Sequence, residues 1–277
     1  IIKYTKKIAI ANKESIICGW NLIEKELLKN NTKFIPVDSE HFSIWYGLKN
    51  NNNPVEKIYL TASGGPFRNL PISKFKSIKM KDALNHPNWT MGEKITIDSA
   101  TMMNKVFEII EAKNIFNLKY DQLSILIQPD SYIHAIIKFK NGLIKLIAHH
   151  TDMKIPIMNT LYNKNNFINL SKSNINISKL NNLKLSKVNL KRFPLVKLIN
   201  KLPKKNSLYE TVLVSANDEF VGQFLEKKIK FTDINYKMNK ILNMREFIKY
   251  KNKFANKTDD ILKLSNYVRF KIISKSI

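Results

Sequence analysis

The segment DSATMMNKVFEIIE, residues 98–111, decides the fold because it predicts a helix whose faces carry different chemistry. Its Met, Val, Phe and Ile residues supply an apolar face. Asn104, Glu108 and Glu111 recur at i, i+4 and i+7 on another face, and Ser99 stands at the expected amino terminus, where an anion is favoured. A phosphate and a metal ion would suit this set. A solvated face with a lysine–glutamate pair is the alternative.

Strand and helix patterns alternate on both sides of this segment, which indicates an α/β layer. The fold class we expect is α/β, with an α+β catalytic domain of strands and flanking helices and a small helical bundle after it. Strands are expected at 6–10, 32–38, 58–61, 93–98 and 123–127, and as a hairpin around Asn141-Gly142. Helices are expected over 15–28 and 41–49, and after a Ser or Thr cap near residue 99.

The rest of the chain is predicted in three blocks. Residues 70–93 form a loop-like stretch, and 159–191 form a long linker rich in Asn, Lys and Ser. From about residue 193 the pattern is helical. No apolar run approaches the length of a membrane helix. The single cysteine, Cys18, excludes an intramolecular disulfide and fits a reducing compartment.

The net charge of +25 raises the possibility of a nucleic-acid-binding protein. However, only four of the 47 basic residues are Arg, and the Lys residues are spread along the chain. Nucleic-acid sites usually favour Arg for bidentate contacts. Because Lys, Asn and Ile are all frequent together, we interpret the charge as compositional drift of an AT-rich genome, and expect no nucleic-acid partner.

Three further motifs carry candidate chemistry, each with a structural alternative. PVDSEH places Asp38 and Glu40 two residues apart at a strand end, which suits Mg²⁺ or Mn²⁺ or a helix cap. LTASGGPFR exposes Ser63 and two glycines, which suits a phosphate or a plain turn. NHPNWTMGEK holds His86 and Trp89, which suits a lid over a ligand or a loop anchor.

Taken together and in order, ANKES, PVDSEH, LTASGGPFR, HPNW-MG-KI-IDSATMMNK and E-IEA resemble the 1-deoxy-D-xylulose 5-phosphate reductoisomerase family. The resemblance covers residues 8–157 and returns at FPLVKLI and at 211–234. It implies a metal-dependent rearrangement and NADPH-linked reduction of 1-deoxy-D-xylulose 5-phosphate to 2-C-methyl-D-erythritol 4-phosphate, in non-mevalonate isoprenoid synthesis. Its implied cofactors are NADPH and Mg²⁺ or Mn²⁺.

The resemblance also implies roles for individual residues. As metal ligands it implies Asp38, Glu40 and Glu108. As substrate contacts it implies Ser39, Ser63, His86, Trp89, Ser99, Asn104 and Lys105. As catalytic groups it implies Lys13, His86, Lys105 and His134, and near the cofactor Asn12, Lys13, Glu14, Met91 and Gly92.

The sequence departs from the family in several places. Val106-Phe107 replace Gly-Leu, Gln128 and Asp130 alter an HPQS motif, His149-His150-Thr151 replace Gly-x-Pro, and Val214 replaces an Asn. Residue 1 corresponds to a point near the end of the family's nucleotide-binding domain, so we expect either part of a longer protein or a lost or separate cofactor domain. The alternative function is therefore an inactive or split remnant.

The expected domains follow from the resemblance. They are 1–38, the end of the NADPH-binding domain; 39–158, the catalytic domain with a flap at 63–93; 159–192, a linker; and 193–277, a helical domain. We expect a homodimer acting on a phosphorylated sugar, with no membrane partner, in a bacterial cytoplasm or, alternatively, a plastid stroma.

Overall fold

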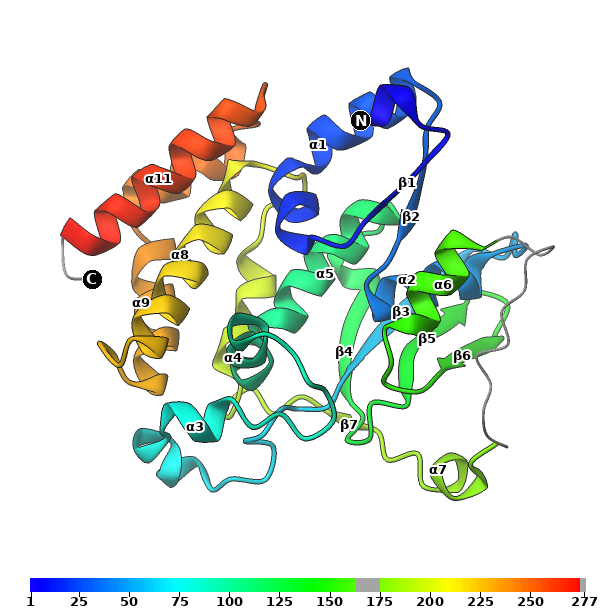
Figure 1. Cartoon of the computed structure of the whole chain (residues 1–277), viewed down its shortest axis with the longest axis horizontal. Coiled ribbons are helices and arrows are strands. Elements are labelled where there is room, and N and C mark those ends of the chain that lie inside the picture. Colours follow the sequence, from blue (N-terminus) through cyan, green and yellow to red (C-terminus); the bar gives the residue numbers. More distant parts are fainter. Residues whose placement is uncertain (163–174, 275–277) are drawn as a thin grey trace.

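The amino-terminal segment forms a small parallel sheet beside a long helix (Figure 1). In the computed structural model, which describes residues 1–162 and 175–274, β1 (Lys7–Ile10) pairs with β2 (Lys33–Pro36). The crossover between them is α1 (Lys13–Lys29), as parallel pairing requires. The strand and helix predicted here are confirmed within a few residues.

A larger mixed sheet carries the middle of the chain. Within the described residues it has the order β6-β5-β3-β4-β7, and only the β3–β4 pairing is parallel. Its strands are β3 (Val55–Ala62), β4 (Leu123–Ile127), β5 (Ile133–Phe139), β6 (Ile144–Ala148) and β7 (Ser186–Lys187). The predicted hairpin joins β5 to β6, and Gly142 supplies its left-handed turn residue at φ +87°.

Helix α5 (Met103–Ile115) lies at the centre of the molecule (Figure 1). One side of it packs on the sheet through Ile109 and Ala112, and the other side packs through Val106 and Phe107 against the carboxy-terminal helices. Those helices are η4 (Pro194–Lys201), α8 (Leu208–Leu225), α9 (Phe231–Leu242), α10 (Arg245–Ile248), η5 (Lys249–Asn252) and α11 (Thr258–Ser274). The helical pattern predicted from residue 193 is confirmed.

Shorter elements complete the chain. Helix α2 (Ser39–Leu48) follows β2 directly and contacts β5, as predicted for residues 41–49. The other elements are η1 (Ile2–Tyr4), η2 (Ile72–Ser77), α3 (Met80–Ala83), α4 (Glu93–Thr101), η3 (Tyr120–Gln122), α6 (Lys154–Leu161) and α7 (Ile177–Asn181).

The strand predicted at 93–98 is wrong, because this segment is helix α4. Alternating Ile95 and Ile97 favoured a strand, but tertiary packing overrides that local pattern. The helix is held by an i,i+4 ion pair between Lys94 and Asp98, and the hydroxyl of Thr96 donates to the carbonyl of Gly92. The Lys–Asp spacing was the sequence signal that indicated a helix.

The predicted Ser or Thr cap of α5 is also wrong. Ser99 and Thr101 lie in the last turn of α4, and the residue that precedes α5 is Met102 in the left-handed region at φ 64°. The chain turns sharply there, so the two helices meet at an angle. Ser99 consequently reaches the site from the end of α4 and not from the start of α5.

The stretches predicted as loop and linker contain regular structure. Residues 70–93 include η2 and α3. In the predicted linker, α7 and β7 are formed, and Ser186 and Lys187 pair with β4 at the sheet edge. Residues 163–174 of that linker lie outside the described residues. The short β7 escaped prediction because backbone pairing, and not side-chain periodicity, defines it.

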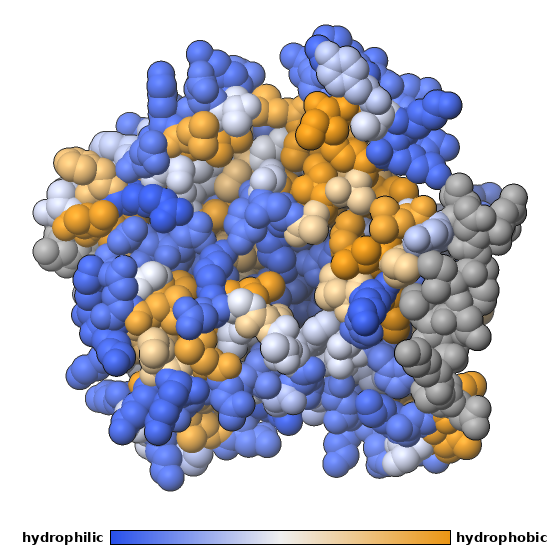
Figure 2. Space-filling model, viewed as in Figure 1, coloured by the Kyte–Doolittle hydropathy of each residue, from blue (hydrophilic) through white to orange (hydrophobic). Residues whose placement is uncertain are grey.

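The mixed α/β class with a helical carboxy-terminal part is confirmed. In the described part of the chain no helix is long and apolar enough to cross a membrane. On the face shown in Figure 2, hydrophobic residues gather near β1 and β2, and smaller hydrophobic patches lie over the carboxy-terminal helices among hydrophilic residues.

Candidate functional site

Three carboxylates from two elements meet at the centre of the molecule. Asp38 follows β2 and precedes α2, Glu40 lies in the first turn of α2, and Glu108 lies in the middle of α5. One carboxylate oxygen from each lies within 4.8 Å of the others. Oδ2 of Asp38 and Oε2 of Glu108 are buried, and each faces a lysine ammonium group, that of Lys13 and that of Lys105 respectively. Hard oxygen ligands in this number suit Mg²⁺ or Mn²⁺.

The polar face of α5 is buried, so the alternative of a solvated face is wrong. Only 5% of Lys105, 1% of Glu108 and 2% of Glu111 is exposed. The alternative of a simple helix cap for Asp38 also fails, because its side chain makes no capping hydrogen bond to α2. These polar groups are buried in contact with one another, at a desolvation cost that solvent-facing residues would avoid.

Two lysines lie among the carboxylates. Nζ of Lys13 is 2.8 Å from Oδ2 of Asp38 and 3.5 Å from Oε1 of Glu108. Nζ of Lys105 is 2.7 Å from Oε1 of Glu40 and also pairs with Glu108. Lys13 further donates to Oδ1 of Asn104 at 2.7 Å, which links the start of α1 to the first turn of α5.

Burial and charge shift the pKa values of these groups in opposite directions. Burial, reinforced by the carboxylate of Glu40, raises the pKa of Glu108 to about 7. Burial would also raise the pKa of Asp38, but Lys13 and His41 outweigh it and hold that pKa well below its usual value. Burial opposes the charge on Lys13, yet Asp38 and Glu108 keep its pKa well above the usual value. The cluster therefore holds Asp38 ionised, and a proton on Glu108 is readily gained or lost.

Beside the carboxylates, a histidine and two serines form a group of hydrogen-bond donors. Nδ1 of His86 accepts the backbone N–H groups of Asn88 and Trp89, at 3.2 and 3.0 Å. Burial lowers the pKa of His86 to about 4, so the ring is neutral and its hydrogen is on Nε2. Nε2 lies 3.3 Å from Oγ of Ser63 and 3.1 Å from Oγ of Ser99.

The turn that holds Ser63 depends on glycine. Gly64 and Gly65 adopt positive φ values of 83° and 62°. A Cβ on Gly65 would lie 3.0 Å from the carbonyl oxygen of Ser99, so only glycine lets this turn approach the end of α4. The N–H of Gly65 donates to Oγ of Ser63 at 3.0 Å, which leaves that hydroxyl free to donate to an anion.

The two groups share one cavity of about 260 Å³. The predicted site residues that line it are Lys13, Asp38, Ser39, Glu40, Ser63, His86, Trp89, Met91, Ser99, Asn104, Lys105, Glu108 and His134. The ring of Trp89 faces that of His134 at 6.3 Å, edge to face, so the flap residues approach the sheet across the cavity. The roles of these residues as ligands, substrate contacts and catalytic groups stay predictions.

Three residues predicted near the cofactor do not line the cavity. Asn12 caps α1 by accepting the N–H of Ser15, Glu14 pairs with Lys94 at 2.6 Å, and Gly92 precedes α4. Their positions are explained by local structure, and their proposed contacts with NADPH stay a prediction.

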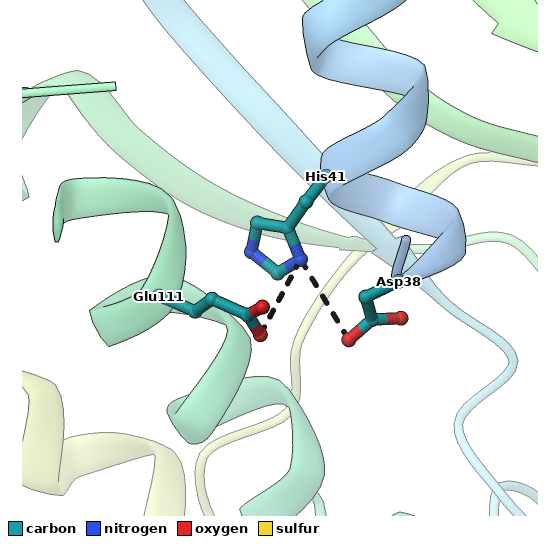
Figure 3. Close-up of side chains that lie close together, drawn as sticks. All are labelled: Asp38, His41 and Glu111. Atoms are coloured by element: carbon teal, nitrogen blue, oxygen red, sulfur yellow. Dashed lines mark ion pairs between the residues drawn. The ribbon is translucent and has the colours of Figure 1, made fainter. Parts of the chain in front are cut away.

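The sequence reasoning missed His41. Its ring is fully buried between Asp38 and Glu111, with Nδ1 3.6 and 3.5 Å from their carboxylates (Figure 3). From the sequence, Glu111 is only one of several polar positions on the predicted helix. The available signal was spacing, because His41 is three residues after Asp38 and Glu111 three after Glu108, so each shares a helix face with a candidate ligand.

Comparisons with known proteins identify the family of this chain. Residues 34–116 match the family model of the 1-deoxy-D-xylulose 5-phosphate reductoisomerase C-terminal domain, and residues 149–271 match that of the DXP reductoisomerase C-terminal domain. The chain is 61% identical over its whole length to the 1-deoxy-D-xylulose 5-phosphate reductoisomerase of Pelagibacter ubique, of which it covers 71%. It is 44% identical to that of Sulfurihydrogenibium over 85% of the chain and 62% of the relative.

Solved structures give the same result. A crystal structure of DOX-P reductoisomerase in complex with NADPH, fosmidomycin and magnesium superposes with a TM-score of 0.90 at 31% identity, over 99% of this chain and 71% of that one. The enzyme from Zymomonas mobilis, in complex with NADPH, gives a TM-score of 0.83 at 31% identity, over 97% of this chain and 68% of that one. This chain belongs to the 1-deoxy-D-xylulose 5-phosphate reductoisomerase family.

Proposed function

We propose that this chain supplies the metal and substrate site of an enzyme that converts 1-deoxy-D-xylulose 5-phosphate to 2-C-methyl-D-erythritol 4-phosphate with NADPH. One observation carries the proposal. The carboxylates of Asp38, Glu40 and Glu108 share a 260 Å³ cavity with the donors of Ser63, Ser99 and His86. A cation site beside an anion site fits a phosphorylated sugar that binds a metal through its oxygens.

The carboxylates fit Mg²⁺ or Mn²⁺. A divalent ion there would polarise a substrate carbonyl and stabilise negative charge on its oxygen. Asp38, Glu40 and Glu108 would hold that ion, because one carboxylate oxygen of each lies within 4.8 Å of the others. Lys13 and Lys105 would then provide N–H donors to oxygens of the substrate beside the ion.

The donors of the second group would hold the phosphate. Ser63 and Ser99 donate O–H groups, and His86 donates from Nε2 because its Nδ1 is occupied by backbone N–H groups. Trp89 and Met91 line the same cavity from the flap side, where they would exclude water during the reaction. When bound, NADPH would supply the hydride for the reduction, and the residues that would hold it on this chain lie at the start of α1 and near residues 91–92.

The experiment is Glu108→Gln in the intact protein, with Mn²⁺ binding followed by electron paramagnetic resonance and substrate-dependent NADPH oxidation followed by absorbance. Gln keeps the shape of Glu108 but removes one anionic ligand, so we expect the Mn²⁺ affinity and the rate of substrate-dependent NADPH oxidation each to fall at least about 10-fold. The matched control is Glu56→Gln, an exposed glutamate on β3 that pairs with Lys138. Unchanged Mn²⁺ affinity and turnover in Glu108→Gln would contradict the site.

The alternative of an inactive remnant has its own outcome in this assay. A remnant would bind Mn²⁺ in a Glu108-dependent way but would not oxidise NADPH with substrate. Separate addition of a cofactor-binding chain would then restore turnover if the enzyme is split.

Finer assignments are also proposed. A homodimer is supported by strand β6, which lies at the edge of the larger sheet. Ile144 and Leu146 of this strand, and Leu143 just before it, are each about half exposed or more. Mn²⁺ as well as Mg²⁺ follows from the all-oxygen ligand set. A bacterial cytoplasm follows from the bacterial sources of the named relatives, and the domain limits 39–158 and 193–277 stay as predicted.

A further inference from the structure

A second buried cluster adjoins the proposed metal site and is not explained by it. His41 is on α2 and Glu111 is on α5, and the exposed fractions of the two residues are 0% and 2%. Figure 3 shows both side chains and Asp38 pointing toward one another from the two helices. Within the described residues, His41 is the only ion-pair partner of Glu111. A buried carboxylate with so few contacts is costly for stability, which suggests that it is retained for function.

The ring of His41 connects the two elements that carry the metal ligands. Nε2 lies 2.9 Å from the backbone carbonyl of Glu108, so it donates to the α5 turn that carries the third carboxylate. On the other side Nδ1 faces Oδ2 of Asp38 and Oε2 of Glu111, at 3.6 and 3.5 Å. His41 thus contacts the carboxylate of the proposed ligand Asp38 and the backbone carbonyl of the proposed ligand Glu108.

The contact geometry differs on the two sides of the ring. The bond from Nε2 has the length of a normal hydrogen bond, whereas the two contacts of Nδ1 are ion-pair separations, longer than hydrogen bonds. The ring plane also stacks on Phe116 at 6.5 Å between centroids, which restricts its rotation. The backbone bond and this packing fix the ring, and the fixed ring then limits where the carboxylate of Asp38 can lie.

We propose that His41 and Glu111 act as one positioning pair that sets the distance between Asp38 and Glu108 and so preorganises the site for one divalent ion. This inference rests on the proposed metal site. His41 and Glu111 do not touch the ion; they orient the side chains that do. Partners of metal ligands commonly affect affinity in this way, with losses of about 10- to 100-fold when they are removed.

Charge alone predicts that loss of His41 does not weaken Mn²⁺ binding, whereas the positioning role predicts weaker binding. This difference makes the proposal testable. While Asp38 stays ionised, as its ion pair with Lys13 favours, removing the imidazole beside it leaves the direct electrostatic attraction for a cation unchanged or strengthens it. Weaker Mn²⁺ binding in His41→Gln would therefore report lost geometry. Glu111→Gln removes a negative charge as well as an orienting contact, so both effects weaken binding in that variant.

The experiment measures Mn²⁺ affinity and stoichiometry by electron paramagnetic resonance in the intact protein, for His41→Gln, Glu111→Gln and the double variant. We expect each single variant to bind Mn²⁺ at least about 10-fold more weakly, and the double variant to lose no more than the weaker-binding single one, because the residues act as a unit. The matched control is Glu210→Gln, which neutralises another fully buried glutamate, on α8, and should change Mn²⁺ affinity less than about 2-fold.

Three results would overturn the proposal. They are unchanged or tighter Mn²⁺ binding in His41→Gln, additive losses in the double variant, and a second ion bound between Asp38, His41 and Glu111, seen as two Mn²⁺ per chain. Should His41→Gln fail to fold, as judged by circular dichroism, His41→Asn replaces it in the same assay, because it also removes the imidazole without removing a negative charge. Glu108→Gln tests the site itself, so a failure of the proposed function would appear as Mn²⁺ binding that does not depend on Glu108.

Discussion

Lys94 joins three separate segments of the chain, and replacing it tests how that junction is held. Its Nζ lies 2.6 Å from Oε1 of Glu14 on α1, 3.2 Å from Oδ2 of Asp98 on α4 and 3.0 Å from Oδ1 of Asp218 on α8. Asp98 is the critical partner because its side chain is only 2% exposed. In the described part of the chain Lys94 is its only ion-pair partner, and Asn217 donates to its other oxygen at 2.7 Å.

We expect Lys94→Met to lower the free energy of unfolding by about 2–3 kcal/mol. Leaving a buried carboxylate without its cation typically costs about 3–5 kcal/mol. The value is reduced here because a third of the Lys94 side chain is exposed, so solvent screens part of the interaction. Glu14 and Asp218 are partly exposed, and water can solvate their carboxylates in Lys94→Met, so they add little to the loss of stability.

The assay is urea denaturation at pH 7, with the midpoint compared at unchanged slope. In an Asp98→Asn background, Lys94→Met should cost less than about 1 kcal/mol, because no buried charge is then left unpaired. Lys228→Met is the control, since Lys228 forms an exposed ion pair with Glu226 and its replacement should leave the urea midpoint nearly unchanged. A cost for Lys94→Met below about 1 kcal/mol, or one that Asp98→Asn does not reduce, would refute the reasoning.

Three further predictions concern the site and its surroundings. In urea denaturation, Gly65→Ala should destabilise the protein by about 1–2 kcal/mol more than Gly142→Ala. Both glycines have positive φ, but only a Cβ on residue 65 would meet the carbonyl oxygen of Ser99. Equal losses of stability would contradict this. Burial raises the pKa of Glu210 from 4.5 to about 7, so its contribution to stability is full below pH 4.5 and is lost as pH rises through 7. The free energy of unfolding of Glu210→Gln, relative to that of wild type, should therefore rise by about 3 kcal/mol between pH 4 and 8. A difference between the two proteins that does not change with pH would be inconsistent with that pKa. His86→Ala should raise KM for the substrate about 10- to 100-fold, with a smaller change in kcat, because a hydrogen bond to the phosphate is lost. An unchanged KM in steady-state kinetics would rule that contact out.

Much of the fold followed from local pattern. The hairpin at Asn141-Gly142 and the helices after residue 193 were predicted correctly, because turn chemistry and 3.6-residue periodicity are properties of short segments. Helix α4 was not, since Ile95 and Ile97 alternate like a strand, and packing against α5 and α8 outweighs that pattern. Local signals do not report which neighbour a segment will meet.

For the site, the sequence by itself determined which residue types were available and in what order. The sequence indicated Asp38 and Glu40 as paired carboxylates at the end of a strand and Glu108 as a carboxylate on a helix face, and family resemblance identified the chemistry. Only the tertiary structure decided that α2 and α5 bring these carboxylates within 4.8 Å of one another, with His41 and Glu111 buried behind them. The physical reason is that desolvation and charge–charge interaction depend on distances between segments far apart in the chain. Sequence spacing cannot fix those distances, whereas packing of α5 between the sheet and the carboxy-terminal helices does.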